Sequence, residues 1–170
     1  MSRLHVCSLA LLADTVATTG ARSLMTLLSP GTPVERPVCI PAERHCYVAI
    51  SDIVAPAPGQ VVPLAEHLLE MLAFVRAWDR VEPMVIHCYA GVSRSTAAAF
   101  IAACALAPCR SERTIARALR KASPTATPNP RLVALADDML ERNGRMSSAI
   151  AEIGRGEDCF AGTPFALELI

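Results

Sequence analysis

The sequence predicts an α/β protein with a central, mostly parallel sheet of about four strands flanked by helices. Candidate strands and helices alternate in the first half of the 170 residues, and helical patterns dominate the second half. No internal repeat and no domain-sized linker interrupts this order. Alternation of this kind is typical of a parallel sheet that helices cover on both faces.

Local signals bound the elements of the first half. Gly20 suits the end of the first helix, Pro63 suits the first turn of the second helix, and Pro83 breaks that helix before the last strand. Segment 46–50 (Cys-Tyr-Val-Ala-Ile) is rich in β-forming residues. We therefore expect strands at 4–8, 22–28, 46–50 and 84–88, and helices at 9–18 and 63–79.

Helical patterns fill the second half. Segment 95–107 is nearly all apolar, which predicts a helix that is buried on most sides. Asn129 followed by Pro130 is a favoured N-cap and first-turn pair, and Gly144 suits the end of the helix that this pair begins. We expect helices at 95–107, 111–122, 129–143 and 146–153.

The composition excludes several classes of protein. Lys and Arg number 16, as do Asp and Glu, so the formal net charge is zero, and 52% of the residues are hydrophobic. This balance argues against disorder and, because a basic excess is missing, against a general nucleic-acid binder. No apolar stretch reaches about 18 residues, so we expect no membrane span. Lys121 is the only lysine, so an anion site would use arginine or backbone N–H groups.

The chain is expected to form one domain over residues 1–170, with a core over about 4–143 and a C-terminal helix and tail over 145–170. Arg3 and the apolar run 4–13 resemble a short signal-peptide core. However, Asp14 closes this run, and a strand followed by a helix explains the same residues. We expect a cytoplasmic protein.

The seven cysteines are expected to be mostly free. Their number is odd, and a domain of this size does not need disulfides. Cys39 with His45 and Cys46 is the nearest candidate for a metal site, but it lacks the second pair of ligands that zinc sites use. We expect no metal and no cofactor.

One segment carries most of the chemical information: 85–95, Val-Ile-His-Cys-Tyr-Ala-Gly-Val-Ser-Arg-Ser. It reads as a strand, a tight loop and a buried helix. Ligands of open α/β sheets bind beyond the carboxyl ends of the strands, and a helix start offers free N–H groups to an anion. Gly91 permits a backbone angle that other residues resist, and Arg94 suits two oxygens of a tetrahedral anion. The same positive field favours the thiolate of Cys88.

This segment resembles the His-Cys-x5-Arg-Ser/Thr signature of the cysteine-dependent protein phosphatases, and the form here is most similar to the dual-specificity branch. The signature spans His87 to Ser95, and the wider pattern spans about 40–143, including Pro128-Asn129 before a helix. A small, bacterial-type single domain is expected. The alternative is that Cys88 only packs at a strand end, and the combined context argues against it.

The resemblance implies roles for the matching residues. Cys88 forms a phosphocysteine intermediate, and Ser95 bonds the sulfur, although a helix-capping serine is the alternative. His87 orders the loop, with its side chain pointing away from Cys88, and Asn129 supports the site. Equatorial phosphate oxygens are held by Arg94 and by the N–H groups of Tyr89, Ala90, Gly91, Val92, Ser93 and Arg94.

A general acid must also reach the pocket. Asp52 follows the strand 46–50 by two residues, at the sheet edge where ligands bind, and the resemblance implies an aspartate before the cysteine. Asp79 and Glu82 lie at the opposite edge, and Asp14 lies in the first helix. The alternative is that Asp52 is a turn residue. The Pro-rich loop 53–59 is expected to preset Asp52 rather than to close over substrate.

These features predict a phosphoester hydrolase, a protein-tyrosine or dual-specificity phosphatase. The alternative is a phosphate-binding or phosphopeptide-binding module with little turnover. Expected ligands are a phosphorylated protein or small phosphoester, with phosphate, sulfate or vanadate as site ligands, and neither nucleic acid nor membrane. The loop carries no lysine or second arginine, which disfavours phosphoinositides. Arg113, Arg117 and Arg120 share one helix face, which is either solvated or a surface for a second acidic group.

Overall fold

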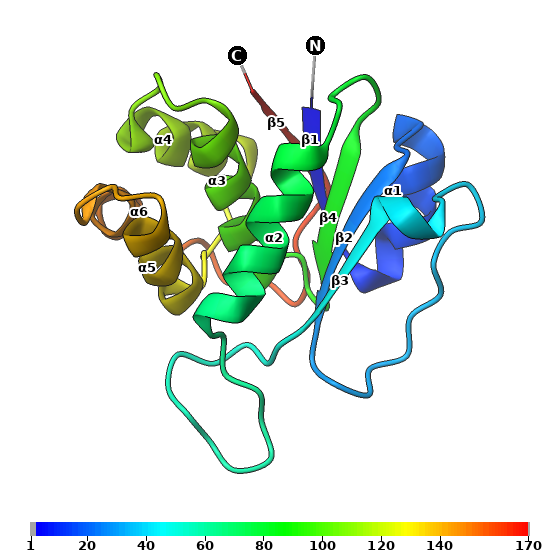
Figure 1. Ribbon diagram of the computed structural model, residues 1–170, viewed down its shortest axis with the longest axis horizontal. Coiled ribbons are helices and arrows are strands. Elements are labelled where there is room, and N and C mark those ends of the chain that lie inside the picture. Colours follow the sequence, from blue (N-terminus) through cyan, green and yellow to red (C-terminus); the bar gives the residue numbers. More distant parts are fainter. Residues whose placement is uncertain (1–2, 170) are drawn as a thin grey trace.

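The computed structural model describes residues 3–169, which form a five-stranded sheet with the order β3-β2-β4-β1-β5 (Figure 1). The first four strands are parallel, and β5 pairs antiparallel with β1. The strands are β1 (Arg3–Ser8), β2 (Ser23–Leu28), β3 (His45–Ala49), β4 (Met84–Cys88) and β5 (Phe165–Glu168). The predicted α/β class is therefore confirmed, with one strand more than expected.

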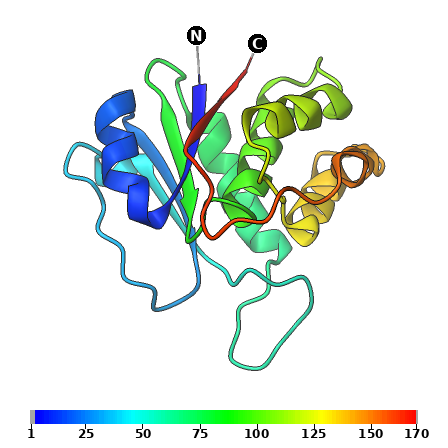
Figure 2. The ribbon, with the colours of Figure 1, turned by 180° about the vertical axis from the view of Figure 1, so that it is seen from behind.

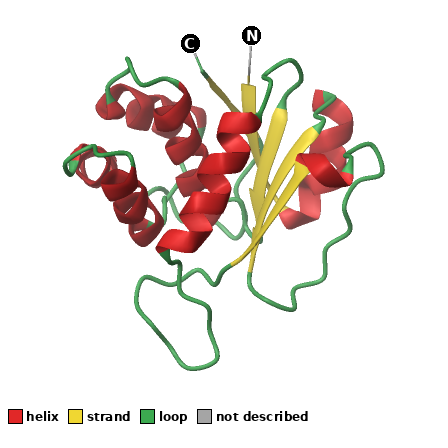
Figure 3. Cartoon of the chain, in the orientation of Figure 1, coloured by secondary structure: helices red, strands yellow, loops and turns green. Residues whose placement is uncertain are grey.

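Helices cover both faces of the sheet. The α-helices are α1 (Leu12–Thr19), α2 (Ala65–Ala77), α3 (Arg94–Leu106), α4 (Glu112–Ala122), α5 (Pro130–Met139) and α6 (Arg145–Ile153). Helix α1 covers one face, and α2 to α6 lie on the other (Figures 1 and 3). None of the helices within residues 3–169 is long and apolar enough to cross a membrane.

The core has two parts because both sheet faces are apolar. The larger part fills the space between the sheet and helices α2, α3, α4 and α5, and the smaller part, with Leu12 and Val16 of α1, lies on the other face. Helix α3 lies in the middle of the larger part, and every residue of it except Ala105 is buried. This confirms the burial expected from its apolar sequence, and it makes α3 a fixed base for whatever lies at its start.

The parallel strands β2 and β3 have their carboxyl ends at the same edge of the sheet. Figure 3 shows long loops, 29–41 and 50–64, leaving β2 and β3 at that edge. The loop between β4 and α3 lies at this edge too, because β4 runs parallel to its neighbours. The carboxyl edge is therefore where the sequence predicts the site.

Several predicted boundaries are wrong in an instructive way. Strand β5 lies in the segment that the sequence predicts as tail. Its four residues are too few to give a strand pattern, and the strand forms because it pairs with β1. Pro63 lies before the N-cap of α2, Leu64, and not in the first turn. The first helix begins as a 3-10 turn, Leu9–Leu11. Gly144 does not end α5; it is the N-cap of α6, with φ of 81°.

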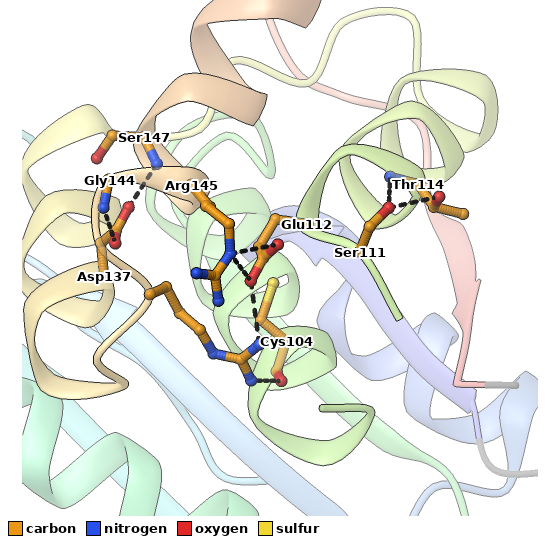
Figure 4. A network of polar contacts seen from close by, with 9 residues as sticks. Cys104, Ser111, Glu112, Thr114, Asp137, Gly144, Arg145 and Ser147 are labelled. Carbon is orange, nitrogen blue, oxygen red and sulfur yellow. Dashed lines mark hydrogen bonds and ion pairs between the residues drawn. The ribbon is translucent and has the colours of Figure 1, made fainter. Parts of the chain in front are cut away.

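The early end of α5 has a physical reason in Asp137. The carboxylate of this buried residue accepts the N–H groups of Gly144 and Ser147, each at 2.8 Å, which anchors the start of α6 to α5 (Figure 4). The chain must turn sharply to reach it, and Glu141 and Asn143 adopt positive φ angles of 53° and 52°. A tertiary hydrogen bond thus overrides the local helical pattern.

Glu112 ties the C-terminal helices together. Its side chain is buried, and it accepts from Arg142 Nη1 at 3.0 Å and from Arg145 Nε at 3.3 Å (Figure 4). Arg142 also donates to the carbonyl of Cys104 in α3, at 3.0 Å. Burial by itself raises the pKa of Glu112, but hydrogen bonds from its own backbone and from Arg145 and Arg142 outweigh burial, so the pKa is lowered.

The arginine row of α4 is used inside the molecule. Arg113 and Arg117 pair with Glu152 of α6, at 2.7 and 2.6 Å. Arg120 donates to the carbonyls of Gly154 and Ala126. These contacts attach α4 to α6 and to the start of the tail, so the row is not a free basic surface.

Replacing Glu112 by alanine should lower the free energy of unfolding by about 3–5 kcal/mol, because the change leaves half-buried Arg142 without its carboxylate partner. Glu152→Ala is the matched control, since Glu152 also pairs with two arginines but at the surface, where such pairs contribute little. Urea unfolding of the two variants measures the difference. Equal losses of unfolding free energy in the two variants would contradict the structural role given to Glu112.

The lowered pKa of Glu112 also sets the sign of a pH effect. The stability that this group contributes is present above the pKa of an unfolded glutamate and is lost as the pH falls through the lower folded value. The difference in stability between the wild type and Glu112→Ala should therefore shrink in acid.

Candidate active site

The loop 89–93 joins the end of β4 to the start of α3, and Cys88 and Arg94 flank it. Cys88 is the last residue of β4 and is buried, and Arg94 is the first residue of α3 and is also buried. The sheet around Cys88 and the packed core around α3 fix the positions of both residues. The N-terminal end of α3 thus faces the same space as the sulfur of Cys88, which combines helix N–H groups with a nucleophile.

Four carbonyls of this loop are bonded to other segments. The donors come from the turn after β1, from the C-terminal tail and from the segment before α5. Leu9 N–H donates to Tyr89 at 3.1 Å, Gly162 to Ala90 at 2.8 Å, Thr127 to Val92 at 2.9 Å, and Asn129 to Ser93 at 3.2 Å. Because each peptide has its carbonyl and N–H on opposite sides, carbonyls bound to the surroundings leave N–H groups for the concave side.

Gly91 is required at its position. Its φ is 71°, and a Cβ there would lie 2.8 Å from both the Cys7 carbonyl carbon and the Ser8 nitrogen. The loop therefore lies directly against the end of β1, where only glycine fits. The N–H of Gly91 donates to Cys88 Sγ at 3.3 Å. Close packing against β1 thus aims a backbone donor at the sulfur.

Cys88 differs from the other buried cysteines in its surroundings. Its Sγ lies 3.0 Å from Ser95 Oγ, besides the contact with Gly91. Burial raises the pKa of the Cys7 thiol to about 11 and that of Cys46 and Cys104 to about 12, so these three stay protonated. All seven cysteines are free, where the sequence predicts mostly free ones. The N-cap of α3 is Ser93, not Ser95, so the capping alternative for Ser95 does not apply.

Arg94 is held by groups that the sequence analysis missed. Its Nη1 donates to the Ile50 carbonyl at 2.8 Å and to Ser29 Oγ at 3.3 Å, at the ends of β3 and β2. Its Nε is buried without a hydrogen-bond partner within residues 3–169. A buried unpaired donor costs free energy, so the guanidinium is oriented and still has a donor for an oxyanion. No residue-type pattern points to a backbone carbonyl or to a lone serine in this role.

Asp52 lies at the edge of the same loop. Its Oδ1 accepts from Ser93 Oγ at 2.7 Å and from Asn129 Nδ2 at 2.9 Å. Asn129 meanwhile caps α5, since its Oδ1 accepts the N–H groups of Arg131 and Leu132. Both donors to Asp52 contact the same oxygen, so Oδ2 is the oxygen that faces no donor within the described chain. The structure thus brings Asp52 together with the loop, as the sequence analysis expects.

The loop after Asp52 is closed at its base and tied to α5. The Ser51 N–H donates to the Val61 carbonyl at 2.8 Å, and the Val61 N–H donates to Ser51 Oγ at 3.2 Å. Arg131 donates to the Pro63 carbonyl at 2.6 Å. These contacts agree with a preset loop, although the role of Asp52 itself stays a prediction.

His87 supports the sheet. Its Nε2 lies 2.8 Å from Thr26 Oγ1 of β2, and the same hydroxyl lies 2.8 Å from His45 Nε2 of β3. Burial lowers the pKa of His87 to about 4, so this ring is neutral near pH 7. His87 therefore ties β4 to β2, which differs from the expected bond to the loop. The alternation of side chains along a strand is the reason, since neighbours point to opposite faces.

The rival acids are occupied elsewhere. Asp79 and Glu82 both pair with Arg44 at 2.9 Å, in the turn before β4 and thus at the amino edge of the sheet. Asp14 lies in α1. Among the carboxylates that the sequence analysis weighed, Asp52 is the one at the loop.

Comparison with known proteins agrees with this geometry. Residues 57–122 match the family model of the protein-tyrosine phosphatases. No curated protein has a significant sequence match. The fold is similar to human DUSP28, with 21% identity, a TM-score of 0.63 and coverage of 82% of this chain and 92% of that chain.

Two further structures share the fold. Cydia pomonella PTP-2 phosphatase has 20% identity and a TM-score of 0.61, over 79% of this chain and 84% of that chain. A mouse putative dual specificity phosphatase, complexed with zinc tungstate, has 21% identity and a TM-score of 0.58, over 82% of this chain and 80% of that chain. These origins give no support to a bacterial type.

A methyl group at Gly91 should weaken oxyanion binding. Gly91→Ala should push the loop from the end of β1 and move the N–H groups, so the affinity for vanadate should fall about 10-fold or more. Gly20→Ala is the matched control, because Gly20 also has positive φ, 68°, but nothing lies within 4 Å of its added Cβ. Titration calorimetry with sodium vanadate measures the affinity of both variants. Equal affinity in the two variants would refute the role of this close contact.

Proposed function

We propose that this chain is a cysteine-dependent protein phosphatase that hydrolyses phosphate monoesters on proteins through a phosphocysteine intermediate, a proposal that its signature, its family match and its fold support. The observation that carries the proposal is the arrangement around Cys88 Sγ, with Gly91 N–H at 3.3 Å and Ser95 Oγ at 3.0 Å. Arg94 lies at the start of α3 with a free Nε. A thiolate, a ring of donors and a guanidinium together match a tetrahedral dianion.

In the first step, the Cys88 thiolate attacks phosphorus, and a sulfur–phosphorus bond forms as the phosphorus–oxygen ester bond breaks. Asp52 gives its proton to the leaving oxygen. The loop N–H groups of Tyr89, Ala90, Gly91, Val92 and Ser93, together with Arg94, stabilise the equatorial oxygens. The bond from Ser93 Oγ to Asp52 supports this pairing, since it links the acid to the loop that holds the phosphate.

In the second step, water attacks the phosphocysteine and Asp52 accepts the water proton. The sulfur–phosphorus bond breaks, and Cys88 leaves as a thiolate that accepts a hydrogen bond from Ser95. Phosphate is the product. The two roles of Asp52 require first the acid and then the base, which gives a bell-shaped dependence of rate on pH.

The substrate is a phosphoprotein in this proposal, with phosphotyrosine and also phosphoserine or phosphothreonine accepted. Tyr89, the first residue of the loop, is 62% exposed, and in this proposal its ring contacts the substrate chain. The loop 89–93 carries no lysine or additional arginine, which argues against polyphosphorylated lipids. Seven free cysteines are typical of a reducing compartment, so we place the protein in the cytoplasm.

Turnover of p-nitrophenyl phosphate tests the proposal. Cys88→Ser and Arg94→Ala should abolish detectable hydrolysis, and Asp52→Asn should lower kcat by about 100-fold or more because the leaving group loses its proton donor. Wild-type hydrolysis should be inhibited by vanadate. Glu157→Gln, at an exposed tail position, is the control that should keep wild-type rates.

Two results would overturn this reading. Wild-type protein that binds phosphopeptide but shows no turnover at high enzyme concentration would indicate a binding module. Turnover that survives in Cys88→Ser would exclude the phosphocysteine route.

The contact between Asn129 and Asp52 predicts a selective variant. Asn129→Asp keeps an N-cap, because Asp caps helices as well as Asn, but it replaces the amide donor with a like charge beside Asp52. The thermal midpoint should fall somewhat, because the second carboxylate is buried beside Asp52. In protein that is still folded, kcat should fall at least several-fold and the acid limb of the pH profile should move. Asn129→Ser is the control that retains a cap without adding charge. A normal pH profile in Asn129→Asp would remove Asn129 from the site.

A further inference from the structure

The C-terminal tail reaches the catalytic loop. Residues 154–164 leave α6, pass the loop and enter β5, and Figure 2 shows this path beneath the sheet edge. Gly162 is buried there, and its N–H donates to the Ala90 carbonyl at 2.8 Å. This segment lies outside the range 57–122 that matches the family model.

Space, and not backbone conformation, requires glycine at this position. A Cβ on Gly162 would lie 2.8 Å from the Gly91 carbonyl oxygen and 3.5 Å from Thr125 Oγ1. The φ of Gly162 is outside the range that disfavours other residues. A larger residue would therefore have to displace the Gly91 carbonyl. The adjacent Ala90–Gly91 peptide would move with it, and this peptide carries both the carbonyl that accepts from Gly162 and the N–H that contacts Cys88 Sγ.

Gly91 is thus enclosed from two sides. The end of β1 lies against its Cα, with Cys7 and Ser8 atoms at 2.8 Å from a Cβ position, and Gly162 of the tail lies against its carbonyl. Ser8 is the register partner of Cys88 in the sheet. The positions of sulfur and donor are consequently set by contacts with one strand and one tail segment.

The tail is itself anchored before and after Gly162. Gly156 N–H donates to Thr127 Oγ1 at 3.1 Å, and Glu157 N–H donates to the Pro124 carbonyl at 3.0 Å. After Gly162, β5 pairs with β1 through residues 165–168. A segment fixed at both ends transmits its position to the loop that it contacts.

We propose that Gly162 is a positioning residue of the catalytic loop, acting through Ala90 and Gly91 to aim the Gly91 N–H at the sulfur and the bound phosphate. The proposal rests on the proposed phosphatase function and adds a tail segment to its site. Gly162 does not touch substrate. It holds the geometry in which the loop donors are already oriented before substrate binds, which is the source of electrostatic stabilisation in such sites.

Gly162→Ala tests the proposal against Gly154→Ala. Both variants add one methyl to the same tail, but Gly154 has nothing within 4 Å of a Cβ, and its positive φ of 64° makes its variant the more strained in backbone terms. Gly162→Ala should lower kcat for p-nitrophenyl phosphate and the affinity for tungstate, each by about 10-fold or more. Gly154→Ala should keep the wild-type kcat and tungstate affinity, even if its thermal midpoint falls further than that of Gly162→Ala.

Two outcomes oppose the proposal. Gly162→Ala with wild-type kcat and tungstate affinity would overturn it, and so would losses that merely follow thermal stability across both variants. An inactive wild type that still binds tungstate would defeat the phosphatase proposal alone, and the tungstate comparison would still decide the role of Gly162.

A second measurement uses unmodified protein and covers a variant that fails to fold. Amide hydrogen exchange should slow at Gly162 when tungstate saturates the site, because an ordered loop strengthens the bond to Ala90. Exchange at Gly154 should not change. Unaltered exchange at Gly162 under saturation would contradict the proposal.

Discussion

The outward anchoring of the loop carbonyls is the constraint on which the site depends. A five-residue loop between a strand and a helix has many conformations, and few of them direct several N–H groups at one point. Here the carbonyls of Tyr89, Ala90, Val92 and Ser93 accept bonds from three other parts of the chain, and the Gly91 N–H contacts Cys88 Sγ. The anion site that we propose for this protein of zero net charge would therefore consist of backbone groups and one guanidinium, with no need for a basic surface.

This constraint explains why distant segments matter to the chemistry. Three segments donate hydrogen bonds to the same loop: the turn after β1, the segment before α5 and the C-terminal tail. Each of them is fixed by the sheet or by a helix. Asn129 shows the coupling most clearly, because its side chain caps α5 and donates to Asp52, while its backbone N–H donates to the Ser93 carbonyl. The Glu112 and Asp137 contacts lie among the C-terminal helices (Figure 4). They join α4, α5 and α6, and thereby fix the helices from which the tail departs.

Much of this architecture is visible in the sequence, for identifiable reasons. The four parallel strands and the buried helix α3 follow from apolar runs, and Cys88, Arg94 and Asp52 follow from a signature and from strand ends. What the sequence does not reveal depends on contacts without a residue-type pattern. Strand β5 exists because it pairs with β1, the end of α5 follows a tertiary bond to Asp137, and the Ile50 carbonyl that holds Arg94 could belong to any residue.

The proposed function depends above all on transfer of the phosphoryl group to Cys88 Sγ. Rapid acid quench of the enzyme during turnover of p-nitrophenyl phosphate, followed by peptide mass spectrometry, tests it directly. The account predicts one phosphoryl group, on Cys88, whose amount rises in Ser95→Ala because the departing thiolate loses its hydrogen bond. Steady turnover with no phosphorylated Cys88 at any quench time, or phosphate on a different residue, would contradict the account.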